Sequence, residues 1–342
     1  MKKIVGILAA AAIATSVFAA DVSAGAKVAS TLFNSKDGAI SLLGTLNNDL
    51  TANYKTLFSL QFSSDNAGGG VKYWGGSATG FDKDTYDKEL KKTDGDPLKA
   101  FGNKDFVAFD SFNVWFKPTD ALKLSFRENG LELFGDKYNG YYAHNVAGAT
   151  GGYGLTYAAD ALTLDLRLGE NFVSKAKDAD AVVGALGAKL SYSADFGSVA
   201  AVFEASNTFK NFKVGAGYSG SFGDVGVVFN AGAVLEDGKD AVIGINPSAG
   251  GSIDAISWAL DVPVEIADKA KVGLNAKASY ALDAAKLTAY FEDANLLADG
   301  DFAAKIGCAI EGSVGAASWK VDPSFDTAKK EFNVALETGI SF

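Results

Sequence analysis

The sequence is poor in the residues from which most catalytic and metal sites are built. Its 342 residues include one cysteine (Cys308), one histidine (His144) and one methionine (Met1). A single cysteine excludes an intramolecular disulfide and a site with several thiolates, and a single histidine excludes most zinc sites. These scarcities disfavour most enzymes. We expect no catalytic residue, no cofactor and no metal ligand.

Long apolar runs are also missing. After residue 20 no stretch approaches the roughly 18 uninterrupted apolar residues that a membrane-spanning helix needs, although 48% of all residues are hydrophobic. Charged residues make up 21%, and the formal net charge is -10 with no basic cluster. An acidic chain of this kind binds nucleic acid poorly, so we expect no nucleic-acid partner. Glycine and phenylalanine are frequent instead, with 39 and 24 residues.

Residues 1–20 have the pattern of a secretory signal peptide. Two lysines precede an apolar stretch, and small residues then allow cleavage after Ala19 or Ala20. The alternative is an uncleaved membrane anchor, which the shortness of the segment disfavours. We therefore predict a signal peptide at 1–20 and a single exported domain at 21–342.

Alternation of apolar and polar residues with a period of two dominates the rest of the chain. In residues 162–168, leucines occupy one face, and Thr163, Asp165 and Arg167 occupy the other. Such strands need one apolar and one polar surrounding. Alternation is less regular at 240–246 and 313–321. The clear candidate strands are 22–33, 38–46, 53–62, 105–117, 121–128, 150–158, 161–169, 183–194, 197–206, 209–220, 223–235, 252–262, 270–281, 285–292, 301–312 and 331–342.

The connections between these strands alternate in length. Tight turns run from an aromatic residue to an aspartate, as from Tyr157 to Asp160 and from Tyr192 to Asp195. Short turns at one end, long loops at the other and aromatic residues at the boundary are typical of a transmembrane β-barrel. Because placing all these turns on one side favours 18 strands while 16 stays open, we predict an all-β, transmembrane antiparallel β-barrel of 16–18 strands. The longer polar loops are expected at 63–104, 129–149, 170–182 and 321–330.

The polar face of the predicted strands carries regularly placed charges. On a soluble β-sandwich these would be ordinary solvent-exposed positions. In a barrel of this size that face lines water, and mixed charges there sort solutes. Lys or Arg facing lipid at mid-depth would cost ~2–4 kcal/mol, so the charges must point inward. The predicted pore-lining residues are Lys123, Arg127, Asp165, Arg167, Lys189, Glu204, Lys213, Lys277, Lys305 and Glu337.

With its leader, its alternating strands and a last strand that ends Gly339-Ile340-Ser341-Phe342, the sequence resembles the outer-membrane porins of Gram-negative bacteria. The stretch 112–126, with its Lys-Pro-x-Asp turn, is similar to hairpins of spirochaete-type porins. The resemblance implies a water-filled channel for passive diffusion of small hydrophilic solutes and ions. It also implies outer-membrane lipid as the surroundings, a homotrimer, and recognition of the strand ending at Phe342 by the barrel assembly machinery.

In porins a loop after the fifth strand folds into the lumen and narrows the pore. The resemblance places that loop at 129–149, and the constriction residues that it implies are Glu132, Asp136 and Lys137. The Pro-Glu-Phe-Gly-Gly motif usual in that loop is absent from this sequence, which is a departure from the family pattern.

Other interpretations stay open. A surface adhesin or antigen would use its long loops, above all 63–104, to bind host or environmental ligands. A barrel lipase or protease and a secreted soluble β-sandwich are further alternatives. The acidic residues of 81–99 lack the spacing of an EF-hand. Gly215-x-Gly217-x-x-Gly220 precedes a predicted strand, whereas a dinucleotide-binding site needs a helix there.

Overall fold

The computed structural model describes residues 21–34, 39–40, 54–76, 106–127, 131–138, 152–169, 186–206, 209–298 and 303–341. No helix among these residues is long and apolar enough to cross a membrane. The predicted signal peptide at 1–20, the acidic stretch 81–99 and His144 lie outside the described residues, so each of these interpretations stays a prediction.

The described part of the chain is built from β-strands. Three of them are short: β2 Ala39–Ile40, β15 Val264–Ile266 and β16 Ala270–Val272. The other 18 have five or more residues: β1 Asp21–Asn34, β3 Tyr54–Ser63, β4 Ala67–Gly76, β5 Phe106–Thr119, β6 Leu122–Phe126, β7 Gly152–Ala159, β8 Leu162–Gly169, β9 Leu186–Ala194, β10 Gly197–Ser206, β11 Asn211–Phe222, β12 Val225–Leu235, β13 Val242–Ile253, β14 Ile256–Asp261, β17 Leu274–Ala281, β18 Ala285–Asp293, β19 Ala304–Val314, β20 Ala317–Asp326 and β21 Glu331–Ser341.

All of these strands belong to one sheet, and the first strand of the chain pairs with the last. Gly25 of β1 lies opposite Ser59 of β3 on one side and opposite Ser341 of β21 on the other, both in antiparallel register. A first strand with a partner on each side leaves no free edge where the chain begins and ends. This is the connectivity of an antiparallel β-barrel. The predicted fold class is confirmed, and the 18 longer strands agree with the expected 16–18.

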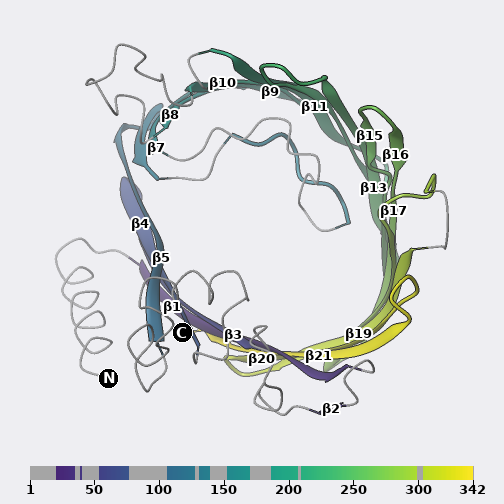
Figure 1. Cartoon of the computed structure of the whole chain (residues 1–342). Coiled ribbons are helices and arrows are strands. Elements are labelled where there is room, and N and C mark those ends of the chain that lie inside the picture. The colour runs from purple at the N-terminus through teal and green to yellow at the C-terminus, as the bar shows by residue number, and fades with distance from the viewer. Residues whose placement is uncertain are drawn as a thin grey trace, which may run out of the picture. The chain divides into compact units, whose positions relative to one another are not determined.

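The chain divides into two compact units. The first holds residues 1–112, 281–288 and 306–342, and the second holds residues 113–280 and 289–305. In the second unit, strands that follow one another in sequence pair with one another from β6 to β14, and β14 then pairs with β17. Figure 1 shows β7 to β13 of this unit side by side.

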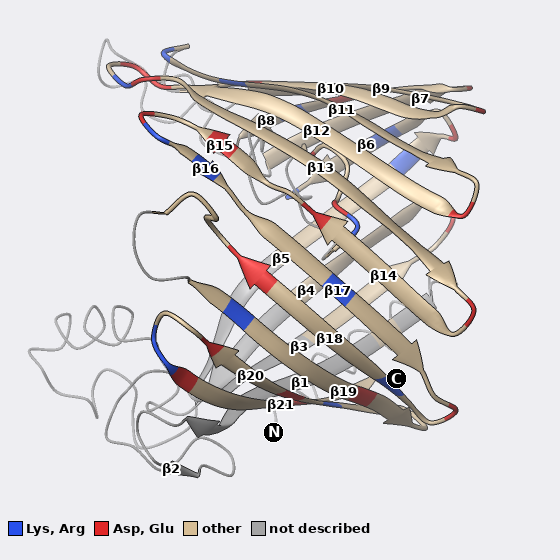
Figure 2. Cartoon of the chain, turned by 90° about the vertical axis from the view of Figure 1, so that its right-hand side faces the viewer, with Lys and Arg blue, Asp and Glu red and all other residues tan. Residues whose placement is uncertain are grey.

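The register of this second unit gives the sheet two chemically different faces. Leu164 of β8 lies opposite Leu190 of β9, and the neighbouring pair is Asp165 opposite Lys189. Because side chains alternate along a strand, each strand presents an apolar face and a polar face, and the register aligns them across the sheet. Strands β12 and β13 contain no charged residue, and acidic residues lie in the turns that follow them (Figure 2).

The tight turns of the second unit contain aspartates, among them Asp160, which the sequence pattern singled out. Asp160 and Asp254 have φ of 50° and 52°, and Gly223 has φ of 60°. This left-handed region is open to glycine and is tolerated by aspartate, so the turn sequences suit the backbone that they adopt. The Tyr218 hydroxyl also donates a hydrogen bond of 2.7 Å to the carbonyl of Phe196, which ties β11 to the turn after β9.

Of two sequence-based expectations near the N-terminus, one is untested over most of its length and the other needs correction. Of the expected strand 38–46, only Ala39–Ile40 is described, as the short strand β2, and the rest lies outside the described residues. Residues 67–76, expected inside the polar loop 63–104, form β4, which pairs with β3. The sequence AGGGVKYWGG conceals this strand because glycine disfavours strands and has no side chain that could alternate.

A third correction concerns β20. The less regular candidates 240–246 and 313–321 correspond to strands β13 and β20, but β20 extends to Asp326. The expected loop 321–330 is therefore the end of a strand followed by a turn over 327–330. Pro323 lies inside β20, opposite Val334. Proline is rare within strands because it has no N–H to donate, which is why the pattern indicated a loop.

Candidate functional site: the polar face and the segment that crosses it

The structure places all ten predicted pore-lining residues within strands or directly after one. Lys123 and Arg127 belong to β6 and its end, Asp165 and Arg167 to β8, Lys189 to β9, Glu204 to β10, Lys213 to β11, Lys277 to β17, Lys305 to β19 and Glu337 to β21. None of these placements tests the predicted role in a pore. The placements show which of these charged side chains lie near one another on the polar face of the sheet.

On the polar face of the second unit, charges of opposite sign approach each other. The Arg167 guanidinium lies 3.7 Å from the Asp165 carboxylate, and the Lys213 ammonium lies 3.7 Å from the Glu204 carboxylate. The Lys123 ammonium lies over the Trp115 ring, 5.6 Å from its centroid. Strands β5 to β11 thus present both signs of charge on one face, as a surface that meets ions in water requires.

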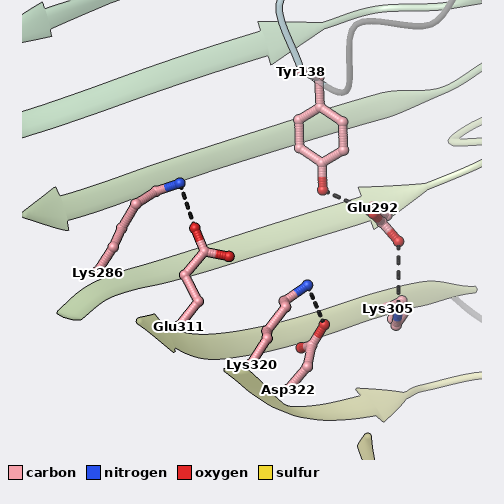
Figure 3. A network of polar contacts seen from close by, with 7 residues as sticks. All are labelled: Tyr138, Lys286, Glu292, Lys305, Glu311, Lys320 and Asp322. Atoms are coloured by element: carbon pink, nitrogen blue, oxygen red, sulfur yellow. Dashed lines mark hydrogen bonds and ion pairs between the residues drawn. The ribbon is translucent and has the colours of Figure 1, made fainter. Parts of the chain in front are cut away.

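The first unit carries similar pairs on its strands. Lys286 of β18 donates a hydrogen bond of 2.7 Å to the Glu311 carboxylate of β19, and the Lys320 ammonium lies 3.0 Å from the Asp322 carboxylate on β20 (Figure 3). The Lys286–Glu311 pair is exposed to solvent and contributes little stability, on the order of 0–1 kcal/mol, whereas Lys320 and Asp322 are partly buried. Their effect is to place charge along the strands.

Acidic residues in the connection between β12 and β13 pair with lysines, one from the same connection and one from the connection between β10 and β11. Lys239 donates a hydrogen bond to the Glu236 carboxylate, and the Lys210 ammonium lies 3.6 Å from the Asp237 carboxylate. The hydrogen bond and the positive charge of Lys239 lower the pKa of Glu236. Glu236 therefore keeps its negative charge to a lower pH than an ordinary glutamate does.

Residues 131–138 follow β6 in the sequence but lie across the polar face of the second unit, where they contact β10, β12 and β13. Leu131 and Leu133 are buried against Ala200 and Val202 of β10, and Phe134 packs on the edge of this cluster. Among the buried hydrophobic residues that the structure describes, Leu131, Leu133 and Tyr138 have the largest side chains, and the others are alanines and valines. We call residues 131–138 the crossing segment.

Hydrogen bonds fix the first half of the crossing segment to strands β9 and β12. The Lys189 ammonium donates a hydrogen bond of 2.7 Å to the carbonyl of Glu132. The Asn230 side-chain amide donates one of 2.6 Å to the carbonyl of Phe134. An extended segment without a paired strand needs such partners because buried backbone carbonyls are costly when unpaired.

The second half of the crossing segment reaches β13, β17 and β18. The backbone N–H of Lys137 donates a hydrogen bond of 2.6 Å to the Ser248 hydroxyl. The Tyr138 hydroxyl donates one of 2.8 Å to Glu292, whose carboxylate also lies 3.9 Å from the Lys305 ammonium (Figure 3). The Lys277 ammonium lies 5.0 Å from the centroid of the Tyr138 ring.

Glycines leave room for the segment on the strands beneath it. A Cβ at Gly217 would lie 2.4 Å from the Asn230 side-chain oxygen and 3.1 Å from the Phe134 ring. Gly226 and Gly250 are similarly close to the Lys137 side chain, at 3.0 and 3.2 Å. Gly217 is part of the Gly-x-Gly-x-x-Gly sequence that resembles a dinucleotide-binding motif. Here its lack of a side chain allows Asn230 and Phe134 to pack closely against β11.

The three predicted constriction residues all lie in the crossing segment. The Glu132 side chain is exposed, Asp136 is buried, and Lys137 is half-buried. Residues 139–149 of the predicted loop lie outside the described residues. Several residues that hold the segment were not singled out from the sequence, notably Val202, Asn230 and Ser248. One sequence feature could have indicated this contact. Ala200 and Val202 of β10 are apolar residues at positions of the polar face, which indicates that an apolar group covers them.

Comparison with known protein families and with curated proteins finds no match. Among solved structures, a triple mutant of the Rhodopseudomonas blastica porin is similar at 11% identity and a TM-score of 0.49, over 94% of this chain and 100% of that chain. Salmonella typhi OmpF in complex with daunomycin is similar at 10% identity and 0.49, over 94% and 97%. The Vibrio cholerae outer membrane protein OmpT, with loop L8 deleted, is similar at 14% and 0.45, over 94% and 99%. Likeness at these values carries no argument for function, so the function proposed for this chain rests on its own residues.

Proposed function

We propose that the protein is a porin of the bacterial outer membrane, a water-filled channel through which small hydrophilic solutes and ions diffuse passively. One observation carries the proposal. Among the described residues, 31 large hydrophobic side chains are exposed, whereas ten hydrophobic residues are buried. A water-soluble protein buries a core and rarely exposes large contiguous apolar patches. The exposed side chains instead suit a sheet whose apolar face contacts lipid.

The polar face supplies the path for water and solutes. A barrel of 16–18 strands leaves an aqueous channel, and its strands alternate between lipid-facing and lumen-facing side chains. In the proposed channel the ten predicted pore-lining residues contact the solution. The pairs Asp165–Arg167 and Glu204–Lys213 give the lumen both signs of charge, which bias the passage of ions without binding them tightly.

The crossing segment sets the narrowest part of the proposed channel. It lies on the polar face, it is fixed at both ends, and Glu132 is its exposed charge. Asp136 and Lys137 contribute to holding the segment, so of the three residues first named for a constriction Glu132 is the one placed to contact solutes.

The proposed function also requires that the protein is exported from the cytoplasm and assembled in the outer membrane. Residues 1–20 are the signal peptide, the strand that ends at Phe342 is the part recognised by the barrel assembly machinery, and the mature protein is a homotrimer. A passive channel performs no covalent chemistry, so the protein is proposed not to be an enzyme and to use no cofactor. The adhesin alternative depends on the long loop that begins after residue 76, which lies outside the described residues, and it stays a prediction.

Solute diffusion can be measured directly in liposomes. We expect liposomes that contain the folded protein to swell when they are diluted into isotonic solutions of small sugars, because the sugars enter and water follows. The rate of swelling should fall as the size of the sugar increases, since the crossing segment limits the width of the path. Liposomes without protein are the control. Failure of the smallest sugar to cause swelling, with the protein shown to be folded and inserted, would contradict the proposal.

A further inference from the structure

Two lysines share one tryptophan ring on the sheet of the second unit. The Lys117 ammonium lies 5.7 Å from the centroid of the Trp115 ring, and the Lys123 ammonium lies 5.6 Å from it. A positive charge within about 6 Å of the centre of an indole ring is attracted to the face of that ring. Trp115 therefore holds two like charges close together, near the end of β5 and the start of β6.

The register brings these three residues to the same face. Trp115 of β5 lies opposite Ser125 of β6. Lys117 follows Trp115 by two residues, and Lys123 precedes Ser125 by two residues. Residues two apart on a strand point to the same side of a sheet. Because leucines occupy the alternate positions of β6, both lysines lie on the polar face, where the proposed function places the water of the channel.

Further along the same face, acidic side chains compensate the positive charges. The Arg167 guanidinium lies 3.7 Å from the Asp165 carboxylate. The Lys189 ammonium is close enough to the carboxylates of Asp165 and Glu132 to be attracted by both. Two positive and two negative side chains thus meet on β8, β9 and the crossing segment, so the charge there is balanced.

The charge at Trp115 is not balanced in this way. Lys117 contacts the Trp115 ring and forms no ion pair with any carboxylate of the described residues, including Asp120 in the adjoining turn. Lys123 takes part in a further interaction, so its charge is shared. At least the charge of Lys117 therefore stays unpaired beside a second ammonium, although the formal net charge of the chain is -10. Like charges held together repel each other, and a bound anion relieves that repulsion.

We propose that Lys117, Lys123 and Trp115 form a binding site in the channel for solutes that bear a phosphate group. This inference rests on the proposed function, because the polar face meets solutes in an open channel. A phosphate group carries roughly 1.5–2 negative charges at pH 7, which suits two neighbouring ammonium groups better than the single charge of a carboxylate does. Lysine binds phosphate as a point charge, so the solute is held weakly and released again, as conduction requires.

The current of single channels in a planar lipid bilayer reports binding of inorganic phosphate. Potassium phosphate added to a KCl solution should lower the current steps in a saturable way, because phosphate at the site hinders the passage of chloride. Potassium acetate at the same potassium concentration is the reference, and it should lower them less. In Lys117→Gln, the phosphate concentration for half of the effect should rise roughly threefold or more, as expected when one charge in contact with water is lost.

Two further variants separate charge at the site from charge elsewhere. Lys117→Arg keeps the positive charge and should respond to phosphate nearly as the unchanged protein does. Lys210→Gln is the matched control, since Lys210 is an exposed lysine that pairs with Asp237 between the strands, and its loss should leave the phosphate effect unchanged. Each variant is first shown to be folded by the shift in gel mobility between unheated and boiled samples. If Lys117→Gln does not fold, Lys123→Gln replaces it.

The outcomes distinguish this site from the channel itself. Current steps that phosphate lowers no more than acetate does would overturn the phosphate site and leave the proposed channel intact. An equal phosphate effect in the unchanged protein and in the folded glutamine variant would overturn the site as well. The absence of any current steps from folded, inserted protein would contradict the channel, and the phosphate site with it.

Discussion

Leu190→Arg is expected to lose the ability to fold into lipid bilayers. Leu190 lies in the middle of β9 and is 48% exposed on the apolar face, where the proposed function places the hydrocarbon of the membrane. Arginine at the midplane of a bilayer costs roughly 2–4 kcal/mol. Since proteins are stable by only about 5–15 kcal/mol, the folded fraction in liposomes should fall clearly. Gel mobility of unheated samples reports that fraction.

The neighbouring position provides the matched control. Ser191 follows Leu190 on the same strand and points to the polar face, so Ser191→Arg should fold into liposomes nearly as the unchanged protein does. A soluble β-sandwich predicts a different result, because an exposed leucine can be replaced by arginine with an effect of about 0.5 kcal/mol or less. Equal folding of Leu190→Arg and Ser191→Arg would therefore contradict the assignment of the apolar face to lipid.

Replacing Leu131 and Leu133 together by serine is expected to release the crossing segment and to raise the conductance of the channel. Both leucines are buried against Ala200 and Val202. Removing one buried leucine side chain costs roughly 2–5 kcal/mol, so the pair should weaken docking by about 4 kcal/mol or more, which is roughly a thousandfold in the docked-to-released ratio. Single-channel recordings should show larger and noisier current steps, and added protease should cleave the released segment.

The control for the released segment is Glu132→Gln. Glu132 lies between the two leucines, but its side chain is exposed, and the segment is held there through its backbone carbonyl. This variant should leave the segment protected from protease and should change ion selectivity more than the size of the current steps. Unchanged conductance of the leucine variant, with the segment demonstrably cleaved, would show that the segment does not set the narrowest point.

Much of the fold could be predicted because each strand carries its own signal. Alternation along β8 and β9 identifies the strands and both of their faces, and the register then brings Asp165 opposite Lys189 without further information. The signal fails where side chains cannot alternate. Glycines conceal β4, and Pro323 conceals the end of β20.

The candidate site was less predictable because it depends on contacts between distant parts of the chain. The sequence places Asp136 and Lys137 in a polar loop, but it does not reveal that the loop lies across β9 to β18 or that Ser248 receives a hydrogen bond from it. Asn230 and Ser248, which hold the segment, form no local pattern, since they lie on two different strands. The apolar residues on the polar face of β10 were the one local signal, and they mark the docking site of the segment.

An open water-filled channel carries ions, so the proposed function is checked by the conductance of single molecules in a planar lipid bilayer. Protein that is refolded, verified by gel mobility and added at low concentration should give discrete, uniform current steps as each molecule inserts. The size of the steps should rise with the salt concentration, as it does for ions that cross a path filled with water. Bilayers that demonstrably contain the folded protein and show no current steps would contradict the account.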